Sequence, residues 1–291
     1  MKYSILLFIV LAKFLVTSDV SAQPFIDIAN VSYQESHPTN LLRHDKQDLK
    51  TKLFSASLNL PVKLGTDYLI FNPHFEQFNM SSGSQLNDKR IYAVYMPVAY
   101  LMQLKNKNWN TTWAILPRIN SDLEYRLASQ DMQTGIAVLN TFEKKSNLKY
   151  TFGIYYNNEF FGPFIIPLVG IDWNVNSRLN IFGNLPNSMN LEYKFSNKLR
   201  GGCSLLFMTN SYRILHSGFL RIDDNHVKTF LDYYLAKSQV LTLEIGHSVL
   251  RKYRSGIREN GNTEYFDEQV SNGILFRIGY SFRLRLDEPK K

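Results

Sequence analysis

Cysteine is nearly absent from this chain: Cys203 is the only one in 291 residues. No intramolecular disulfide and no multi-cysteine metal site can therefore form, and no cysteine stands near the start of the chain to carry a lipid. The protein must gain its stability from a large fold, because the cross-links that small exported domains use are not open to it.

Long apolar runs are also scarce. Beyond the first residues, no stretch of ~18 consecutive apolar positions could span a membrane as a helix. With 44% hydrophobic residues and a mean hydropathy of −0.23, the composition excludes a protein of several membrane helices. Aromatic residues are abundant instead: 17 tyrosines and 20 phenylalanines raise their share to 14%, which favours strands and interfacial girdles.

Catalytic motifs are missing as well. The sequence contains no Gly-x-Ser-x-Gly, no His-Glu-x-x-His and no phosphate-cradling glycine loop. His216-Ser217 and His247-Ser248 are neighbours, but adjacent residues on a strand point to opposite faces, so neither pair makes a dyad. We predict a protein that is not an enzyme, with no catalytic residues, no cofactor and no metal.

The N-terminus has the pattern of a secretory signal peptide. Lys2 supplies a positive start, residues 5–12 an apolar core, and Val20-Ser21-Ala22 a small-residue cleavage site. The alternative, a short membrane anchor, is disfavoured because the apolar run is too short to span. We predict a cleaved signal peptide over residues 1–22 and an exported mature chain over residues 23–291.

The chain is basic, with a formal net charge of +8. Binding to an acidic glycolipid or to nucleic acid could explain this excess, but basic residues at turns and loops explain it equally well. The basic residues are spread along the chain and do not cluster on one segment, so no nucleic-acid partner is predicted.

Alternating apolar and polar residues are the dominant pattern of the chain. Between Phe54 and Val62 the even positions are all apolar and the odd positions between them are Ser or Asn, except Pro61. Because successive side chains on a strand point to opposite faces, this segment is a strand with one oily and one polar face. The pattern repeats from about Phe25 to Leu284 and gives about fourteen strands.

The breaks between these strands alternate between two-to-four-residue turns and, mostly, much longer polar loops. The longest loops are predicted at residues 210–225 and 253–272, and a short strand at residues 178–183 is followed by a tight reversal at residues 184–187. This rhythm is typical of an all-β, antiparallel up-and-down transmembrane β-barrel with short periplasmic turns and long extracellular loops. A soluble β-sandwich also alternates, so the strand pattern alone does not exclude it.

If the oily faces meet lipid, the other parity faces the lumen. The inward charged and titratable candidates, which could line a conduit or a ligand cavity, are His74, Glu76, Arg118, Asp172, Arg200, Lys228, Asp232, Glu244, Arg277 and Arg283. Glu192 and Lys194 share this parity. The alternative is an interior network of salt bridges, in which the bulky inward Tyr68, Tyr155, Phe230 and Tyr234 narrow or block the lumen.

Several motifs resemble a known group of proteins. They are Asn158-Glu159-Phe160-Phe161-Gly162-Pro163-Phe164, Gly170-Ile171-Asp172-Trp173 and, most specific, Phe182-Gly183-Asn184-Leu185-Pro186. The chain resembles a family of outer-membrane β-barrel proteins of Gram-negative bacteria that carries a domain of unknown function. The resemblance implies a fold and a location in the cell outer membrane, but no activity. One departure is the charged segment, residues 284–291, that follows Phe282.

The predicted partners are outer-membrane lipid and, during biogenesis, the barrel-insertion machinery. The predicted function is a porin-like channel or transporter for a small solute or ligand. A structural or surface-interaction barrel, with a lumen plugged by side chains and no transport, is the alternative.

Overall fold

The computed structural model describes residues 24–42, 48–82, 89–124, 126–214, 218–259 and 262–287. The predicted signal peptide, residues 1–22, lies outside the described residues. The only helix in the described ranges is a single 3-10 turn, η1 (Ser129–Asp131). No described helix has the length and the apolar character needed to cross a membrane.

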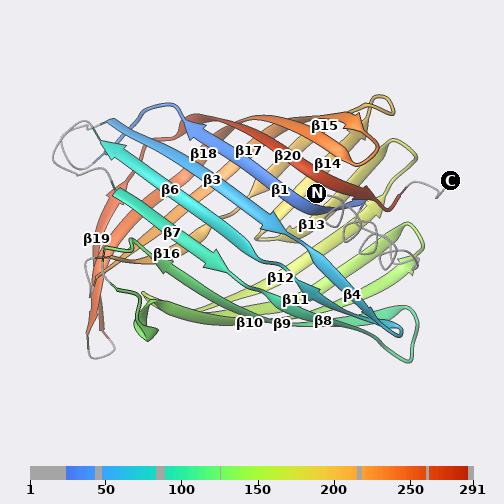
Figure 1. The fold of residues 1–291 in the computed structure, drawn as a ribbon, viewed down its shortest axis with the longest axis horizontal. Coiled ribbons are helices and arrows are strands. Elements are labelled where there is room, and N and C mark those ends of the chain that lie inside the picture. The colour runs from blue at the N-terminus through green and yellow to red at the C-terminus, as the bar shows by residue number, and fades with distance from the viewer. Residues whose placement is uncertain are drawn as a thin grey trace, which may run out of the picture.

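The described strands form one antiparallel sheet that closes on itself (Figure 1). The first strand, β1, pairs with β3 on one side and with the last strand, β20, on the other, from Phe25↔Arg285 to Ser36↔Leu275. The strands are β1 (Phe25–Ser36), β2 (Thr39–Asn40), β3 (Asp48–Leu58), β4 (Leu60–Leu64), β5 (Asp67–Phe71), β6 (His74–Ser82), β7 (Lys89–Tyr95), β8 (Val98–Gln103), β9 (Trp109–Ser121), β10 (Met132–Lys145), β11 (Leu148–Glu159), β12 (Gly162–Asn174), β13 (Leu179–Leu185), β14 (Ser188–Lys194), β15 (Leu199–Leu206), β16 (Thr209–Ile214), β17 (Gly218–Ala236), β18 (Gln239–Glu259), β19 (Asn262–Gln269) and β20 (Gly273–Arg285).

Several of these strands are consecutive pieces of one crossing, namely β1 with β2, β3 with β4, β5 with β6, β7 with β8, β15 with β16, and β19 with β20. The barrel wall therefore has fourteen continuous strands, each of which we call a stave, and this confirms the predicted fold class. Strand β1 begins and β20 ends at the same end of the barrel, the right end in Figure 1, and this end carries short turns such as Lys237-Ser238. We name it the turn end, and the opposite end the loop end.

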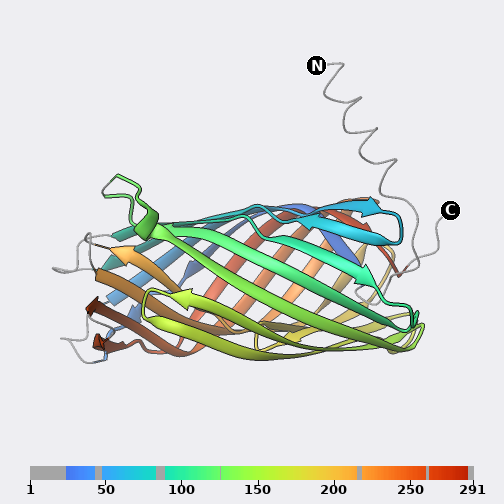
Figure 2. The ribbon, with the colours of Figure 1, turned by 90° about the horizontal axis from the view of Figure 1, so that it is seen from below.

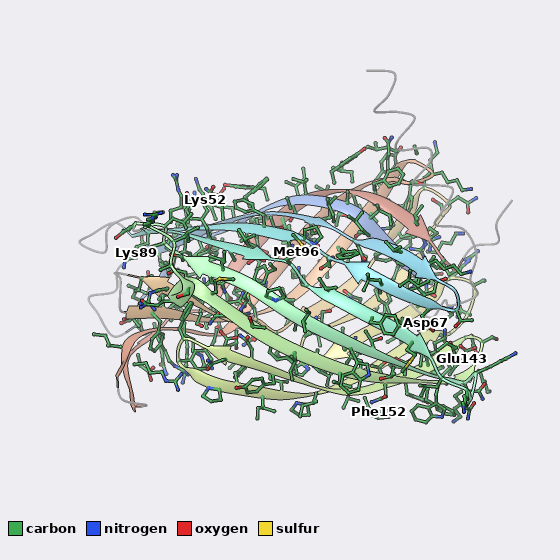
Figure 3. The ribbon with its side chains drawn as sticks, turned by 60° about the horizontal axis from the view of Figure 1, so that its bottom comes forward. Lys52, Asp67, Lys89, Met96, Glu143 and Phe152 are labelled. Atoms are coloured by element: carbon green, nitrogen blue, oxygen red, sulfur yellow. The ribbon has the colours of Figure 1, made fainter. Side chains whose placement is uncertain are left out.

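The distribution of side chains is the reverse of that in a water-soluble protein. The outer face exposes large apolar residues, such as Trp113 at 57% and Ile165 at 61%, whereas Glu192 and Asp232 are buried inside. A soluble β-sandwich hides its oily faces, so this arrangement excludes it. Figure 3 shows the outward Met96 and Phe152 between the charged Lys52 and Lys89 near one end and Asp67 and Glu143 near the other. An apolar band between polar rims fits a membrane.

Two predicted loops are wrong. Much of residues 210–225 lies in the hairpin of β16 and β17, and much of residues 253–272 lies in β18 and β19. In these segments the polar Arg221, Asp223 and Arg254 share one face of the β17–β18 ladder, and the apolar Ile222 and Tyr253 on the other face are buried in the lumen. The alternation is therefore reversed with respect to the membrane-facing parts of the strands, where the apolar residues point outward.

The β13–β14 hairpin is the shortest part of the wall. Each strand has seven residues, against 19 in β17 and 21 in β18. At its tip Gly183 has φ +139°, and a side chain on Gly170 of β12 would collide with Asn184. Gly183 therefore allows the backbone conformation at the hairpin tip, and Gly170 allows Asn184 to pack closely against β12. The hairpin can thus end partway up the barrel.

Candidate functional site

The lumen of the barrel is lined by paired charges. Near the turn end, Glu192 of β14 is fully buried and accepts hydrogen bonds from both terminal nitrogens of Arg285, at 2.8 and 2.9 Å. The Arg200 guanidinium lies 3.3 Å from the same carboxylate, and the Asn180 amide donates to it at 3.1 Å. One carboxylate thus holds two arginines from different strands.

A second cluster ties the first and last strands to β17, which is separated from β20 in the wall only by β18. Arg283 of β20 donates to Asp27 of β1 at 2.6 and 3.1 Å, and to Asp232 of β17 at 2.5 Å. Its guanidinium also lies 3.7 Å from the ring centre of Phe25. These charged hydrogen bonds join the two strands at the closure, β1 and β20, to β17, with which neither of them has a backbone ladder.

Glu244 organises the third cluster. Its carboxylate accepts from Arg277 and lies 2.6 Å from the Lys228 ammonium. Strands β17, β18 and β20 are neighbours in the sheet, and the register places Lys228 opposite Gly246 and Glu244 opposite Arg277. The pairing of three charges on adjacent strands is the ordinary way in which a barrel interior neutralises itself.

Near the loop end, buried polar side chains hold β16 against the opposite wall. Glu159 of β11 accepts from Arg118 of β9, from Gln133 of β10 at 3.3 Å and from the Ser211 hydroxyl of β16 at 2.7 Å. The Asn120 amide donates to the Ser211 carbonyl at 2.9 Å. Strand β16 has a ladder only with β17, and its other edge is held by these side chains and one bridge, Arg213↔Ser121.

An apolar cluster lies beside this anchor and crosses the lumen. It joins one wall, β3, β6 and β7, to the strands β16, β17 and β18. Its buried members are Leu41, Leu49, Phe78, Met80, Ile91, Ala93, Tyr212, Ile214, Leu220, Ile222, Tyr253 and Val270. These residues, together with β16, lie across the lumen near its loop end.

All ten predicted lumen residues lie on the inner face. Nine of them take part in the contacts above or in a similar local pair: His74 lies 2.9 Å from Glu76 on β6, with neither fully buried. Asp172 is half-buried on β12, in register with Lys149, which itself pairs with Glu143 at 3.1 Å. Of the ten predicted residues, only Arg118 belongs to the group of buried polar side chains that holds β16 near the loop end. No cluster of three or more His, Cys, Asp or Glu side chains suited to a metal occurs in the parts of the chain that the structure describes.

Sequence reasoning missed several residues of these clusters. Asp27 and Glu159 carry the correct parity on β1 and β11, and that parity was the available signal. Arg285 and Asp287 belong to the charged segment after Phe282, where β20 continues and places Arg285 against Glu192. The apolar cluster gave a weak signal, because Ile91 and Ala93 occupy inward positions on β7.

A closed fourteen-stave barrel with an apolar exterior and a charged interior defines the class of outer-membrane β-barrels. Within this class the chain belongs to the family of the domain of unknown function DUF6268, whose model matches residues 44–286. The resemblance predicted from the motifs is thereby confirmed.

Solved structures with similar folds are outer-membrane proteins. The COG4313 outer membrane channel from Pseudomonas putida F1 is 10% identical, with 93% of this chain and 100% of that chain covered and a TM-score of 0.50. The KdgM porin is 10% identical over 87% of this chain and 98% of that chain, with a TM-score of 0.34. The toluene transporter TodX of Pseudomonas putida is 9% identical over 88% and 90%, with a TM-score of 0.32. No curated protein matches.

Proposed function

We propose that this protein carries a small solute across the bacterial outer membrane through its lumen, and that β16 with the apolar cluster gates the loop end. The observation that carries this proposal is the attachment of β16. A permanent wall strand has ladders on both edges, whereas β16 has one ladder. On its other edge, Ser211 accepts hydrogen bonds from Asn120 and Gln133 and donates one to Glu159, beside a single bridge, Arg213↔Ser121. Such contacts can be exchanged for water without breaking the barrel.

The proposal places the turn end in the periplasm and the loop end outside the cell, as in bacterial barrels that have both termini on the short-turn side. It includes export by the cleaved signal peptide, insertion by the barrel-insertion machinery and contact of the outer face with outer-membrane lipid. The inward charges, among them Lys228, Glu244 and Arg277, would meet the solute in the lumen. No enzymatic role is proposed.

A second candidate function is a structural barrel that conducts nothing. It is favoured by the pairing of the inner charges, since Glu192, Asp232 and Glu244 each satisfy their partners within the wall. An interior whose charges neutralise one another needs no solute to balance them.

Single-channel recording and liposome swelling with purified protein separate the two. Gly279 lies on the inner face between Ser32 and Thr242, and a Cβ there would meet only ordinary contacts at 3.5 and 3.8 Å. Gly279→Trp therefore fits sterically and fills the lumen, whereas Ile278→Trp on the next position points outward. Transport predicts conductance that Gly279→Trp reduces and Ile278→Trp leaves unchanged. Wild-type protein that stays silent over long recordings would overturn the proposal.

A further inference from the structure

Among the residues that the structure describes, β12 has a long stretch without a partner on one side. Strand β12 pairs with β11 along its whole length, from Leu148↔Trp173 to Glu159↔Gly162. On its other side it pairs with β13 only from Val169↔Leu185 to Asn174↔Asn180. In the described part of the chain, no strand pairs with residues 163–168 on that side. The boundary between residues 163–168 of β12 and residues 207–214 is named the seam.

The short β13–β14 hairpin and the path of β16 create the seam. A membrane-spanning strand needs ~9–11 residues, and β13 and β14 have seven each. Beyond the hairpin the next stave is β15, which ends its contact with β14 where the Phe207 amide donates to Asn187. The chain then turns inward as β16 to reach Glu159 and Asn120, so it does not continue beside β12.

The backbone at the seam is adapted to having no partner. The Asn174 amide donates to Asn147 in the turn before β11, and the Val175 amide donates to Leu179, at the start of β13. Because the hydrogen-bonding side alternates along a strand, the odd residues of β12 point to the seam. These are Pro163, Ile165 and Pro167. Two of the three have no N–H group, so only one amide donor is left without a ladder partner at a depth where each costs several kcal/mol.

The inner face of β12 beside the seam consists of apolar side chains. The even residues of this stretch, Phe164, Ile166 and Leu168, are half-buried on the inner side, while Pro163, Ile165 and Pro167 are exposed on the outer side. Both faces of β12 are therefore apolar beside the seam, in contrast to the charged pairs along β17, β18 and β20. At the top, the Arg221 guanidinium lies 4.2 Å from the Phe161 ring centre and 5.9 Å from that of Phe164.

Three motifs noted in the sequence frame this seam. Residues 158–164 form its upper end, where the Phe160 amide donates to the Ser211 hydroxyl at 3.1 Å. Residues 182–186 form its lower end at the hairpin tip, and residues 170–173 pair directly below it.

We propose that the seam is a lateral gate, through which an apolar small molecule passes between the lumen and the hydrocarbon of the membrane. The inference rests on the proposed transport function and names its substrate class. Prolines at two of three edge positions argue against the other use of a free edge, the addition of a strand from a second chain, because that strand would find almost no donors. An apolar passage needs no donors at all.

Spin labels on single cysteines test whether lipid reaches the inner side of the seam. In a Cys203→Ser background, Ile166→Cys is the test position, and two controls stand at the same height on β11. Tyr155 is in register with Ile166 and faces inward on the fully paired side, and Ile154 is in register with Pro167 and faces outward. Collision rates with molecular oxygen, which concentrates in lipid, and with a water-soluble nickel complex are measured in proteoliposomes.

The lateral gate predicts an oxygen-to-nickel ratio at Ile166 that is close to that at Ile154 and several-fold above that at Tyr155. A ratio at Ile166 equal to that at Tyr155 would overturn the gate. Naphthalene added to the vesicles, as the apolar probe, should lower nickel collisions at Tyr155, because it displaces water from the lumen. Glycerol at the same concentration should leave them unchanged, and equal effects of the two would also count against an apolar route.

The outcomes separate this inference from the proposed function. A high oxygen-to-nickel ratio at Ile166, in a protein that shows neither conductance nor liposome swelling, would overturn the transport function. It would still support contact between lipid and the inner side of the seam. A low oxygen-to-nickel ratio at Ile166, in a protein that conducts, would overturn the lateral gate. The solute would then pass along the barrel axis from one end of the lumen to the other. All variants are first checked for the shift in gel mobility on heating that reports a folded barrel.

Discussion

The depth of each outward residue in the membrane gives a quantitative prediction on β20. Its outward residues include Ile274 and Ile278, exposed at 46% and 48%. A strand rises ~3.3 Å per residue and tilts about 35–45° in a barrel, which gives ~2.5 Å of height per residue. The middle of β20, Gly273–Arg285, is Gly279, so Ile278 lies ~2.5 Å and Ile274 ~12 Å from mid-height.

Arginine at these two positions should therefore have different costs. Near the centre of a belt ~25 Å tall, Ile278→Arg should lower the free energy of unfolding by about 2–4 kcal/mol, and Ile274→Arg at its rim by about 0–1 kcal/mol. The chemistry, the strand and the face are the same in both variants, so the difference reports depth alone.

Urea unfolding in lipid vesicles, followed by tryptophan fluorescence, measures the two free energies. Each is compared with the alanine variant at the same position, which removes the effect of losing the isoleucine. Costs of at most about 1 kcal/mol at both positions would refute the assignment of the outer face to hydrocarbon. A cost of about 2–4 kcal/mol for Ile274→Arg together with a smaller cost for Ile278→Arg would place the apolar belt nearer to the loop end.

Three further outcomes follow from the interior. Glu192→Leu leaves two buried arginines without their carboxylate and should cost about 3–5 kcal/mol in urea unfolding, whereas Glu35→Ala, at a half-exposed pair with Lys50, should cost at most about 1 kcal/mol. Ile222→Ala opens a cavity in the apolar cluster, so it should raise single-channel conductance while costing about 2–5 kcal/mol. Cys203 is exposed on the outer face, so a charged thiol reagent should fail to label it in proteoliposomes until the protein is unfolded.

The faces of the strands could be predicted from the sequence because the barrel preserves strand parity over its whole height. The ten inward residues all follow from this rule, and His74 and Glu76, two positions apart on β6, even share a contact. The charge partners on neighbouring strands could not be predicted in the same way. Asp27 and Arg283 lie 256 positions apart, and their meeting depends on the register between β1 and β20, which no local pattern encodes.

The loop end was the harder part for a different physical reason. There the apolar residues of β16, β17 and β18, such as Ile222 and Tyr253, point into the lumen and the polar residues between them, such as Arg221, lie on the other face. The outward apolar face that identifies the membrane-spanning strands is therefore missing from these segments. The short strand and tight reversal at residues 178–187 were visible in the sequence. Their consequence was not, because a shortened hairpin becomes a seam only when the next stave also turns away.

Hydrogen bonding explains why the seam is a built feature of this wall. Within hydrocarbon, a barrel is stable because closure pairs every backbone group, and a break in the ladder leaves donors and acceptors exposed. A break that arose by accident would carry ordinary residues along its edge and would lose stability for each unpaired amide. Here Pro163 and Pro167 remove two donors on the edge that lacks a partner, and the odd spacing keeps both on that edge. Prolines at even positions would have removed donors from the ladder with β11. The prolines therefore stand only on the edge that lacks a partner, where they reduce the number of unpaired amides in the hydrocarbon.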